Sequence, residues 1–269
     1  MVATMKIIPG LNLTAAPNMP RIPVQTEEEK RIARLPGLVH FFEPDRLSGS
    51  PLAAKDRATP GHPISTPSSA ITASTSSAYD DKTVVTKTAT QAAFAYGAGT
   101  ALESCTILMA CDLSQARITA GLGSTLWAFF NGPINASTAK YALSWRNSDD
   151  RLQFMENYAA GGTPLLLPTI DMPAGDVPFI TALTYDRPTR TSTIFLNSAT
   201  PLATLTHTST PPTIDDDTQI AIGGLYQYGS SGWDGRIGRA LIMDRSYNDP
   251  AYLPLLDREI AAMRAYYGI

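Results

Sequence analysis

Short apolar runs alternate with turn residues about every 8–15 positions from Thr83 onward. This pattern is typical of an all-β sandwich, in which two sheets pack face to face. The predicted strands are Thr83–Thr88, Ala92–Tyr96, Cys105–Asp112, Arg117–Gly121, Trp127–Phe130, Tyr141–Arg146, Leu152–Asn157, Phe179–Asp186, Thr191–Asn197, Ala203–Thr208, Gln219–Gly223 and Arg236–Asp244.

The end of the chain changes from this pattern to a helical one. Asn248 or Asp249 can cap a helix, Pro250 suits its first turn, and Gly268 suits its end. We expect its apolar stripe to pack against the sandwich. The stripe has spacings of three and four and consists of Leu253, Leu256, Ile260, Met263 and Tyr267.

Residues 1–34 show neither the period of a helix nor that of a strand, and they contain recurrent prolines. Thr26 and Glu29 form a capping-box pattern, which predicts a short helix that stops before Pro36. The chain is therefore divided into residues 1–34 and a sandwich over residues 35–269. The first part is either a disordered leader or an arm that docks on another subunit. Docking is favoured by its apolar residues, which include Ile7, Ile8, Leu11, Leu13 and Ile22.

A Ser-, Thr- and Pro-rich stretch over residues 49–77 has little periodicity. A loop of this length is unusual in a compact domain. We expect a surface excursion with one short strand near Ile64 or Ile71.

Composition excludes several classes of function. The net charge of −3 over 269 residues gives no basic surface for nucleic acid. The sequence has no apolar run of about 18 residues, so membrane insertion is not expected. The start of the sequence does not resemble a secretory signal peptide, which favours folding in the cytoplasm. Cys105 and Cys111 would lie about 20 Å apart on one strand, too far for a disulfide, and we expect two buried free thiols without a reactive role.

The closing segment Trp233–Arg245, followed by a helix, resembles the C-terminal signature of laminin-G-like domains in the concanavalin A-like lectin/glucanase superfamily. Residues 35–42 resemble the opening strand of that family, and residues 179–197 resemble its central hairpin. The family's Trp near Lys55 is missing, and Ser198 replaces its usual glycine. The resemblance implies a concanavalin A-like jelly-roll β-sandwich, with an extended N-terminal arm and a short C-terminal helix.

The same segment predicts a tight turn and several core residues. Gly235 is expected to take a positive φ, so that a β-branched residue there would be costly. Ile237, Leu241 and Met243 are expected in the core.

Catalytic patterns are missing from the sequence. The glucanases of the superfamily use a Glu-x-Asp-x-Glu strand, whose alternate carboxylates share one face. Glu103, Asp112 and Glu156 have no such partners, and the three histidines lack metal-type spacing. We therefore expect no enzymatic activity and no catalytic residues.

Calcium is the strongest cofactor candidate, because many relatives bind it with loop carboxylates. Asp215, Asp216 and Asp217 would be its ligands, although three successive acids are also typical of a solvated turn. The expectation is a protein without a bound cofactor.

One loop contains aromatic and polar groups of the kind that bind sugars. Tyr226, Gln227, Tyr228, Trp233 and Asp234 lie within it. The alternative is that Trp233 plugs the end of the sandwich, as its family counterpart does, and that the tyrosines cover it.

A laminin-G-like domain with free thiols, no signal peptide and a Pro-rich apolar arm resembles a bacteriophage virion protein. The predicted function is a structural module of the head or tail that folds in the host cytoplasm. Its arm would dock on other virion proteins, its sandwich would project outward, and it would form homo-oligomers. The alternative is a lectin or adhesin that binds a cell-surface glycan, and a degenerate glycoside hydrolase comes third.

Overall fold

The computed structural model describes residues 26–55, 57–58, 62–66, 68–131, 139–146, 151–156, 164–166, 174–208, 210–224 and 232–269. The chain divides into two compact units, Met1–Arg34 and Leu35–Ile269. In the first unit the helix α1 covers Glu27–Ala33. Its predicted capping box is present, because Thr26 Oγ1 accepts from Glu29 N at 3.1 Å and Glu29 Oε2 accepts from Thr26 N at 2.7 Å. The predicted docking residues of the arm lie outside the described residues.

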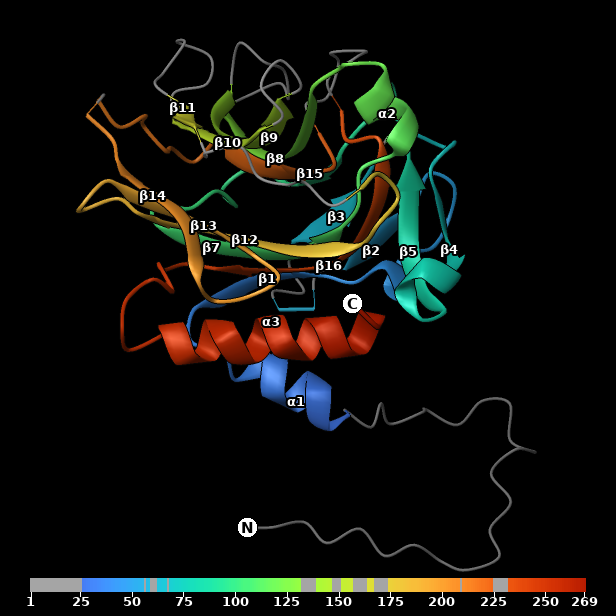
Figure 1. The fold of residues 1–269 in the computed structure, drawn as a ribbon, viewed down its shortest axis with the longest axis horizontal. Helices are drawn as coiled ribbons and strands as arrows, with labels where there is room; N and C mark the ends of the chain where they lie inside the picture. Colours follow the sequence, from blue (N-terminus) through green and yellow to red (C-terminus); the bar gives the residue numbers. More distant parts are fainter. Residues whose placement is uncertain are drawn as a thin grey trace, which may run out of the picture. The chain divides into compact units, whose positions relative to one another are not determined.

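The second unit is a jelly-roll β-sandwich of two antiparallel sheets with a short C-terminal helix, as predicted (Figure 1). Sheet A has the order β14-β13-β12-β7-β16-β5-β4, with β1 beside β16. Its strands are β1 Leu38–Phe42, β4 Thr72–Ser76, β5 Lys82–Lys87, β7 Cys105–Cys111, β12 Phe179–Asp186, β13 Thr191–Leu196, β14 Pro201–Thr206 and β16 Gly235–Met243.

Sheet B has the order β11-β10-β9-β8-β15-β6-β3-β2. Its strands are β2 Ala53–Lys55, β3 Pro63–Ser65, β6 Phe94–Tyr96, β8 Ser124–Asn131, β9 Ala139–Arg146, β10 Arg151–Glu156, β11 Pro164–Leu166 and β15 Thr218–Ile222. The helices of this unit are α2 Gln115–Thr119 and α3 Leu253–Tyr267, with short 3-10 turns at Pro44–Arg46 and Ser77–Tyr79.

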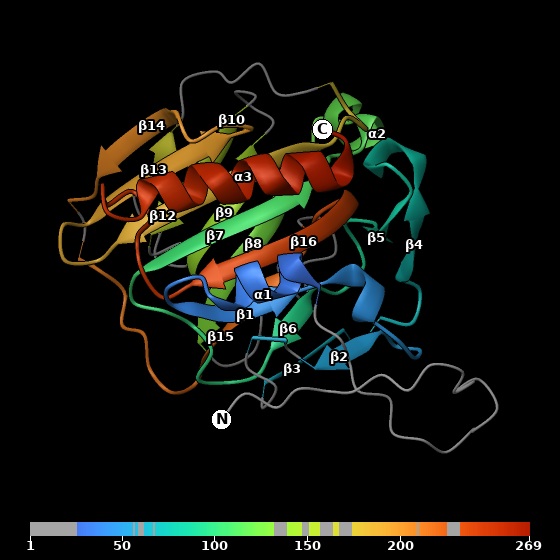
Figure 2. The same cartoon turned by 90° about the horizontal axis from the view of Figure 1, so that it is seen from below.

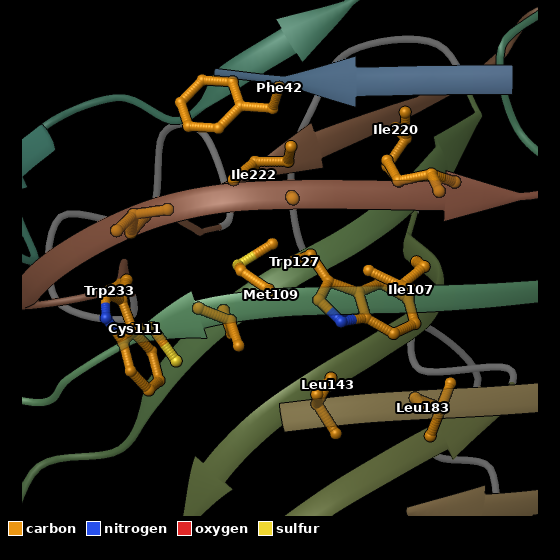
Figure 3. Close-up of a cluster of buried hydrophobic side chains, with 14 of the residues drawn as sticks. Phe42, Ile107, Met109, Cys111, Trp127, Leu143, Leu183, Ile220, Ile222 and Trp233 are labelled. Atoms are coloured by element: carbon orange, nitrogen blue, oxygen red, sulfur yellow. The ribbon is translucent and has the colours of Figure 1, made fainter. Parts of the chain in front are cut away.

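The core lies between the sheets (Figure 3). Ile107 and Met109 of β7 face it, and Leu183 contributes from β12. All seven residues of β7 are buried, because α3 lies across the outer face of sheet A (Figure 2). The Tyr267 hydroxyl of α3 accepts from Arg239 N of β16 at 2.7 Å. The centre of sheet A, around β7 and β16, is therefore covered on both faces, whereas its edge strand β14 is largely exposed.

Three predictions from the pattern need correction. The segment predicted as a strand at Arg117–Gly121 contains the helix α2 instead, because Ser114 caps it and accepts from Arg117 N at 3.1 Å. The stretch over residues 49–77 holds three strands rather than one. The helix α3 begins later than predicted, with Tyr252 as its N-cap, and ends as predicted at Gly268, whose φ is 67°.

The core residues and the glycine predicted for the closing segment are confirmed, whereas the predicted tight turn is not, because Gly235 already begins the strand β16. Ile237, Leu241 and Met243 are buried. Gly235 has a φ of 152°, and a Cβ atom there would lie 2.3 Å from the carbonyl oxygen of Asp112. Close backbone approach therefore requires glycine at this position.

Both cysteines are free and buried. Burial raises the pKa of Cys105 to about 12, which keeps its thiol protonated and unreactive at neutral pH. No helix in the described part of the chain combines the length and the apolar character needed to cross a membrane.

Candidate functional site

The loop predicted to bind sugar is described only at its ends. Tyr226, Gln227 and Tyr228 lie outside the described residues. Trp233 is 0% exposed, and its Nε1 donates to the carbonyl oxygen of Asp112 at 2.7 Å. Its ring lies in the core (Figure 3) and offers no surface on which a sugar could stack. Asp234 is half-buried and accepts from Ser114 Oγ at 3.0 Å.

A buried lysine ties the Trp233 end of this loop to the end of β5. Lys87 Nζ donates to the carbonyl oxygens of Trp233 at 2.9 Å and Thr88 at 3.1 Å. Burial lowers the pKa of Lys87 to about 7. The Trp233 end of the loop therefore has a structural role in the sandwich.

The three successive aspartates form a hydrogen-bonded turn before β15. Asp215 Oδ1 accepts from Thr218 Oγ1 at 2.9 Å and from Asp217 N at 3.2 Å. Asn131 Nδ2 donates to its other oxygen at 2.9 Å. Among the described residues, no group of three His, Cys, Asp or Glu side chains lies where it could hold a metal ion. This applies also to Asp215, Asp216 and Asp217, the predicted calcium ligands.

A surface hollow of about 440 Å³ lies between the β12–β13 turn and the segment that joins β16 to α3. Both segments lie near the start of α3 in Figure 2. The hollow is lined by Asp186, Thr189, Thr191, Arg245, Ser246, Asn248, Asp249, Pro250 and Tyr252. We take this hollow as the candidate site.

The first wall is the β12–β13 turn, which its own side chains hold in shape. Asp186 Oδ2 accepts from Thr189 Oγ1 at 2.6 Å and from Thr189 N at 3.2 Å. Arg190 takes a φ of 55°, which reverses the chain before β13. The turn therefore presents a fixed carboxylate and threonines to the hollow.

The second wall carries the aromatic ring of the site. Tyr252 stacks on Tyr247, with ring centroids 5.5 Å apart and an interplanar angle of 20°. Tyr247 is buried, and its hydroxyl donates to the carbonyl oxygen of Pro36 at 2.8 Å. Arg245 Nη1 donates to the Tyr252 hydroxyl at 3.2 Å. The half-buried Tyr252 ring is therefore held in place before any ligand binds.

The charges of this wall are partly paired. Arg245 Nε donates to Asp244 Oδ1 at 2.9 Å. The hydrogen bonds with Asp244 and Tyr252 raise the pKa of Arg245, so its guanidinium stays charged. Asp249 Oδ1 accepts from Ala251 N at 2.8 Å.

Several polar groups of the hollow remain available. Within the described part of the chain, Asp186 Oδ1, Asp249 Oδ2 and the side-chain amide of Asn248 have no hydrogen-bond partner. An amide can donate and accept, and a carboxylate accepts hydrogen bonds from hydroxyl groups. The hollow thus combines a fixed aromatic ring with convergent polar groups, as small polar ligands require.

No local pattern in the sequence marks this site, because the two segments that form its walls lie about 60 residues apart in the chain. The strands predicted at Phe179–Asp186 and Thr191–Asn197 imply only a turn between them, and Asn248 to Pro250 predict only a helix start. Each interpretation describes the local structure. The only local signal of function was the density of polar groups beside Tyr252.

A second polar cluster lies inside the sandwich, on the other side of the same turn. Glu156 Oε1 accepts from the Tyr185 hydroxyl at 2.5 Å, and Arg190 pairs with the other oxygen. His207 Nδ1 lies 3.8 Å from that oxygen, and His207 Nε2 is 2.6 Å from Ser192 Oγ. Burial raises the pKa of Tyr185 and lowers that of His207.

His207 lies between Ser192 and Glu156, an arrangement similar to that of a nucleophile, a base and an orienting acid in hydrolases. Ser192 and Glu156 are 0% exposed and His207 is 4% exposed. A substrate cannot reach the Ser192 hydroxyl in this arrangement, so we assign the cluster a structural role.

No family model and no curated protein matches the chain. Solved structures do match its fold. Domain 4 of AbnA, a GH43 extracellular arabinanase from Geobacillus stearothermophilus in complex with arabinotriose, aligns with a TM-score of 0.57 and 12% identity. That match covers 83% of this chain and all of that domain.

Trypanosoma rangeli sialidase in complex with sialic acid aligns with a TM-score of 0.55 and 14% identity, over 88% of this chain and 37% of the sialidase. The Ruminococcus gnavus IT-sialidase CBM40 bound to α2,3-sialyllactose aligns with a TM-score of 0.45 and 19% identity, over 58% of this chain and 83% of that one. At these identities the first two matches establish the β-sandwich fold.

The prediction that the chain has no enzymatic activity is wrong by these comparisons. The arabinanase domain and the sialidase described above, which align with TM-scores above 0.5, both come from enzymes. The missing Glu-x-Asp-x-Glu strand excludes one catalytic arrangement, and it does not separate this fold from those of enzymes.

Proposed function

We propose that this protein is a carbohydrate-binding domain and that the hollow beside Tyr252 holds the sugar. The proposal rests on the fixed Tyr252 ring and the polar groups beside it. One carboxylate oxygen of Asp186, one of Asp249 and the side-chain amide of Asn248 have no hydrogen-bond partner among the described residues. A sugar offers an apolar face for the ring and hydroxyl groups for the polar partners. Sites for small ligands typically combine an apolar surface for packing with a few polar groups that fix the orientation of the ligand.

The fold gives secondary support. The arabinanase domain with the same fold was solved with arabinotriose. That finding concerns the arabinanase domain, and it makes an oligosaccharide a reasonable first ligand to test here.

The test compares two half-buried tyrosines of the α3 region. Tyr252 lines the hollow, whereas Tyr266 lies at the far end of α3, where Arg239 packs on its ring at 3.6 Å. A glycan array followed by calorimetry would be run on the wild type, Tyr252→Ala and Tyr266→Ala. Tyr252 makes no side-chain cap bond with α3, so its removal leaves the helix cap unchanged.

We expect Tyr252→Ala to weaken glycan binding at least tenfold, equivalent to about 1.4 kcal/mol, and Tyr266→Ala to leave it unchanged. Absence of binding to every glycan on the array, or equal losses in the two variants, would overturn the proposal.

The virion role is a different hypothesis and stays a prediction. It depends on an arm whose residues Ile7 to Ile22 lie outside the described part of the chain. The fold matches involve proteins that act on or bind sugars, so they favour the carbohydrate-binding alternative.

A further inference from the structure

Paired threonine hydroxyls continue from the hollow toward the edge of sheet A. Thr191 lines the hollow, and its Oγ1 is 3.3 Å from Thr206 Oγ1 on the neighbouring strand β14. Thr193 and Thr204 form the next pair, with hydroxyl oxygens 3.0 Å apart. The hydroxyl row therefore begins at the wall of the candidate site.

The sheet register places this row on one face. Asp186 is opposite Thr191 on β12 and β13, and Thr191 is opposite Thr206 on β13 and β14. Neighbouring strands lie about 4.8 Å apart, and side chains directly opposite each other share a face. Thr206 is exposed, and β14 is the edge strand of the sheet. Polar groups thus continue over about two strand spacings, from the hollow to the sheet edge.

The charges of the hollow favour a ligand without a carboxylate. Asp186 and Asp249 both line it, and Arg245 is the cation among its lining residues. That guanidinium already binds Asp244 and the Tyr252 hydroxyl. An acidic sugar would meet two carboxylates and a cation that is already paired, which disfavours it.

We infer that the hollow binds one end of a linear neutral oligosaccharide and that the Thr191–Thr206 pair holds its second unit. The inference rests on the proposed function. The first sugar lies beside Tyr252, and the second lies over the threonine hydroxyls toward the edge of β14. Hydroxyl groups of threonine donate to and accept from those of a neutral sugar without any charge.

The experiment measures affinity against chain length. Calorimetry would use arabinose, arabinobiose and arabinotriose, together with the mono-, di- and trisaccharides of each neutral glycan that binds on the array. Lactose and 3′-sialyllactose supply the comparison of charge. The variant is Thr206→Val, which keeps the side-chain shape and removes the hydroxyl. The control is Thr200→Val, at an exposed position before β14.

We expect the affinity of the wild type to rise about tenfold from one unit to two and to change little with a third. Thr206→Val should abolish this gain and leave monosaccharide binding unchanged, and Thr200→Val should behave as the wild type. Lactose should bind more tightly than 3′-sialyllactose if either binds.

Binding that does not depend on chain length, an equal loss for all lengths in Thr206→Val, or a preference for the sialylated sugar would overturn this inference and leave the proposed function standing. Absence of binding to every glycan would overturn both.

Discussion

Two polar clusters lie on the two sides of the β12–β13 turn, and they differ in what their polar groups bind. On the outer side, Asp186 and Thr191 face a hollow in which carboxylate oxygens and an amide have no hydrogen-bond partner among the described residues. On the inner side, Glu156 pairs with Arg190 and Ser192 contacts His207. Glu156, Ser192 and His207 are buried, and the side chain of Arg190 is 19% exposed.

This difference indicates that the inner cluster stabilises the fold, whereas the hollow is suited to binding a ligand. A buried carboxylate must be paired, because leaving it unpaired in the interior costs far more than leaving it in water. Glu156 therefore binds Tyr185 and Arg190 and has no accessible surface for a ligand. The groups of the hollow lie at the surface, where water can replace a ligand and a ligand can replace water.

The largest effect is expected for Trp233→Ala, which tests whether this ring belongs to the sealed interior. The indole is 0% exposed, so its removal should lower the free energy of unfolding by about 3–5 kcal/mol. Urea denaturation measures the change. If Trp233 were a sugar platform instead, stability would hardly change and glycan binding would be lost.

Glu156→Gln breaks the inner cluster directly. The charge of Arg190 would lose its buried partner, and we expect a loss of about 3 kcal/mol in the free energy of unfolding with unchanged glycan affinity. The control is Glu103→Gln, which removes the exposed partner of Arg187 and should cost at most about 1 kcal/mol. Similar effects of the two variants would show that the inner cluster is not a stabilising unit.

Gly235→Val tests the backbone contact beside Trp233. The Asp112 carbonyl occupies the space a Cβ would need, and the positive φ adds strain. We expect a loss of roughly 1–3 kcal/mol in the free energy of unfolding. Gly97→Val is the matched control, since a Cβ there would meet no atom within 4 Å and Gly97 has no positive φ.

The pH dependence of stability tests the inner cluster through His207. Burial lowers the pKa of His207 below the ordinary histidine value of 6.5. Above that value the ring is neutral in both states and contributes no slope. Below it, the unfolded chain binds a proton that the folded protein resists, so the free energy of unfolding should fall as the pH decreases. Thermal unfolding from pH 7.5 to 5 should show a shallower fall in His207→Gln, and identical profiles would contradict this role.

The smallest effect on stability is expected in the hollow. Asn248→Ala removes an amide that has no partner in the part of the chain that the structure describes, so the free energy of unfolding should change by less than about 0.5 kcal/mol. Glycan affinity should fall several-fold in the same variant. A large loss of stability would show that the amide is part of the fold.

The sequence predicts the sandwich better than the site. Strands such as Phe179–Asp186 follow from short apolar runs bounded by turn residues, and Ile237, Leu241 and Met243 are buried as predicted. Their period of two does not continue through the strand, because the register shifts between Ile237 and Ala240, and of the three only Ile237 belongs to the core cluster between the sheets. At α2 a single cap by Ser114 decides the local structure, and a short apolar pattern does not reveal it. The hollow needs two segments brought together by sheet pairing and by the position of α3, which no local pattern encodes. The sequence allows Trp233 to be either a sugar platform or a buried plug of the sandwich, and its complete burial in the fold shows that it is buried.

The most direct test of the central claim is where a bound oligosaccharide perturbs the protein. Backbone amide NMR would be recorded with and without the tightest neutral binder from the array. We expect shift changes confined to the hollow and the threonine row, that is, to Asp186, Thr189, Thr191, Thr206, Asn248, Asp249 and Tyr252. Changes confined to residues 225–234, or to the outer face of sheet B, would place the sugar elsewhere and contradict the assignment of the hollow.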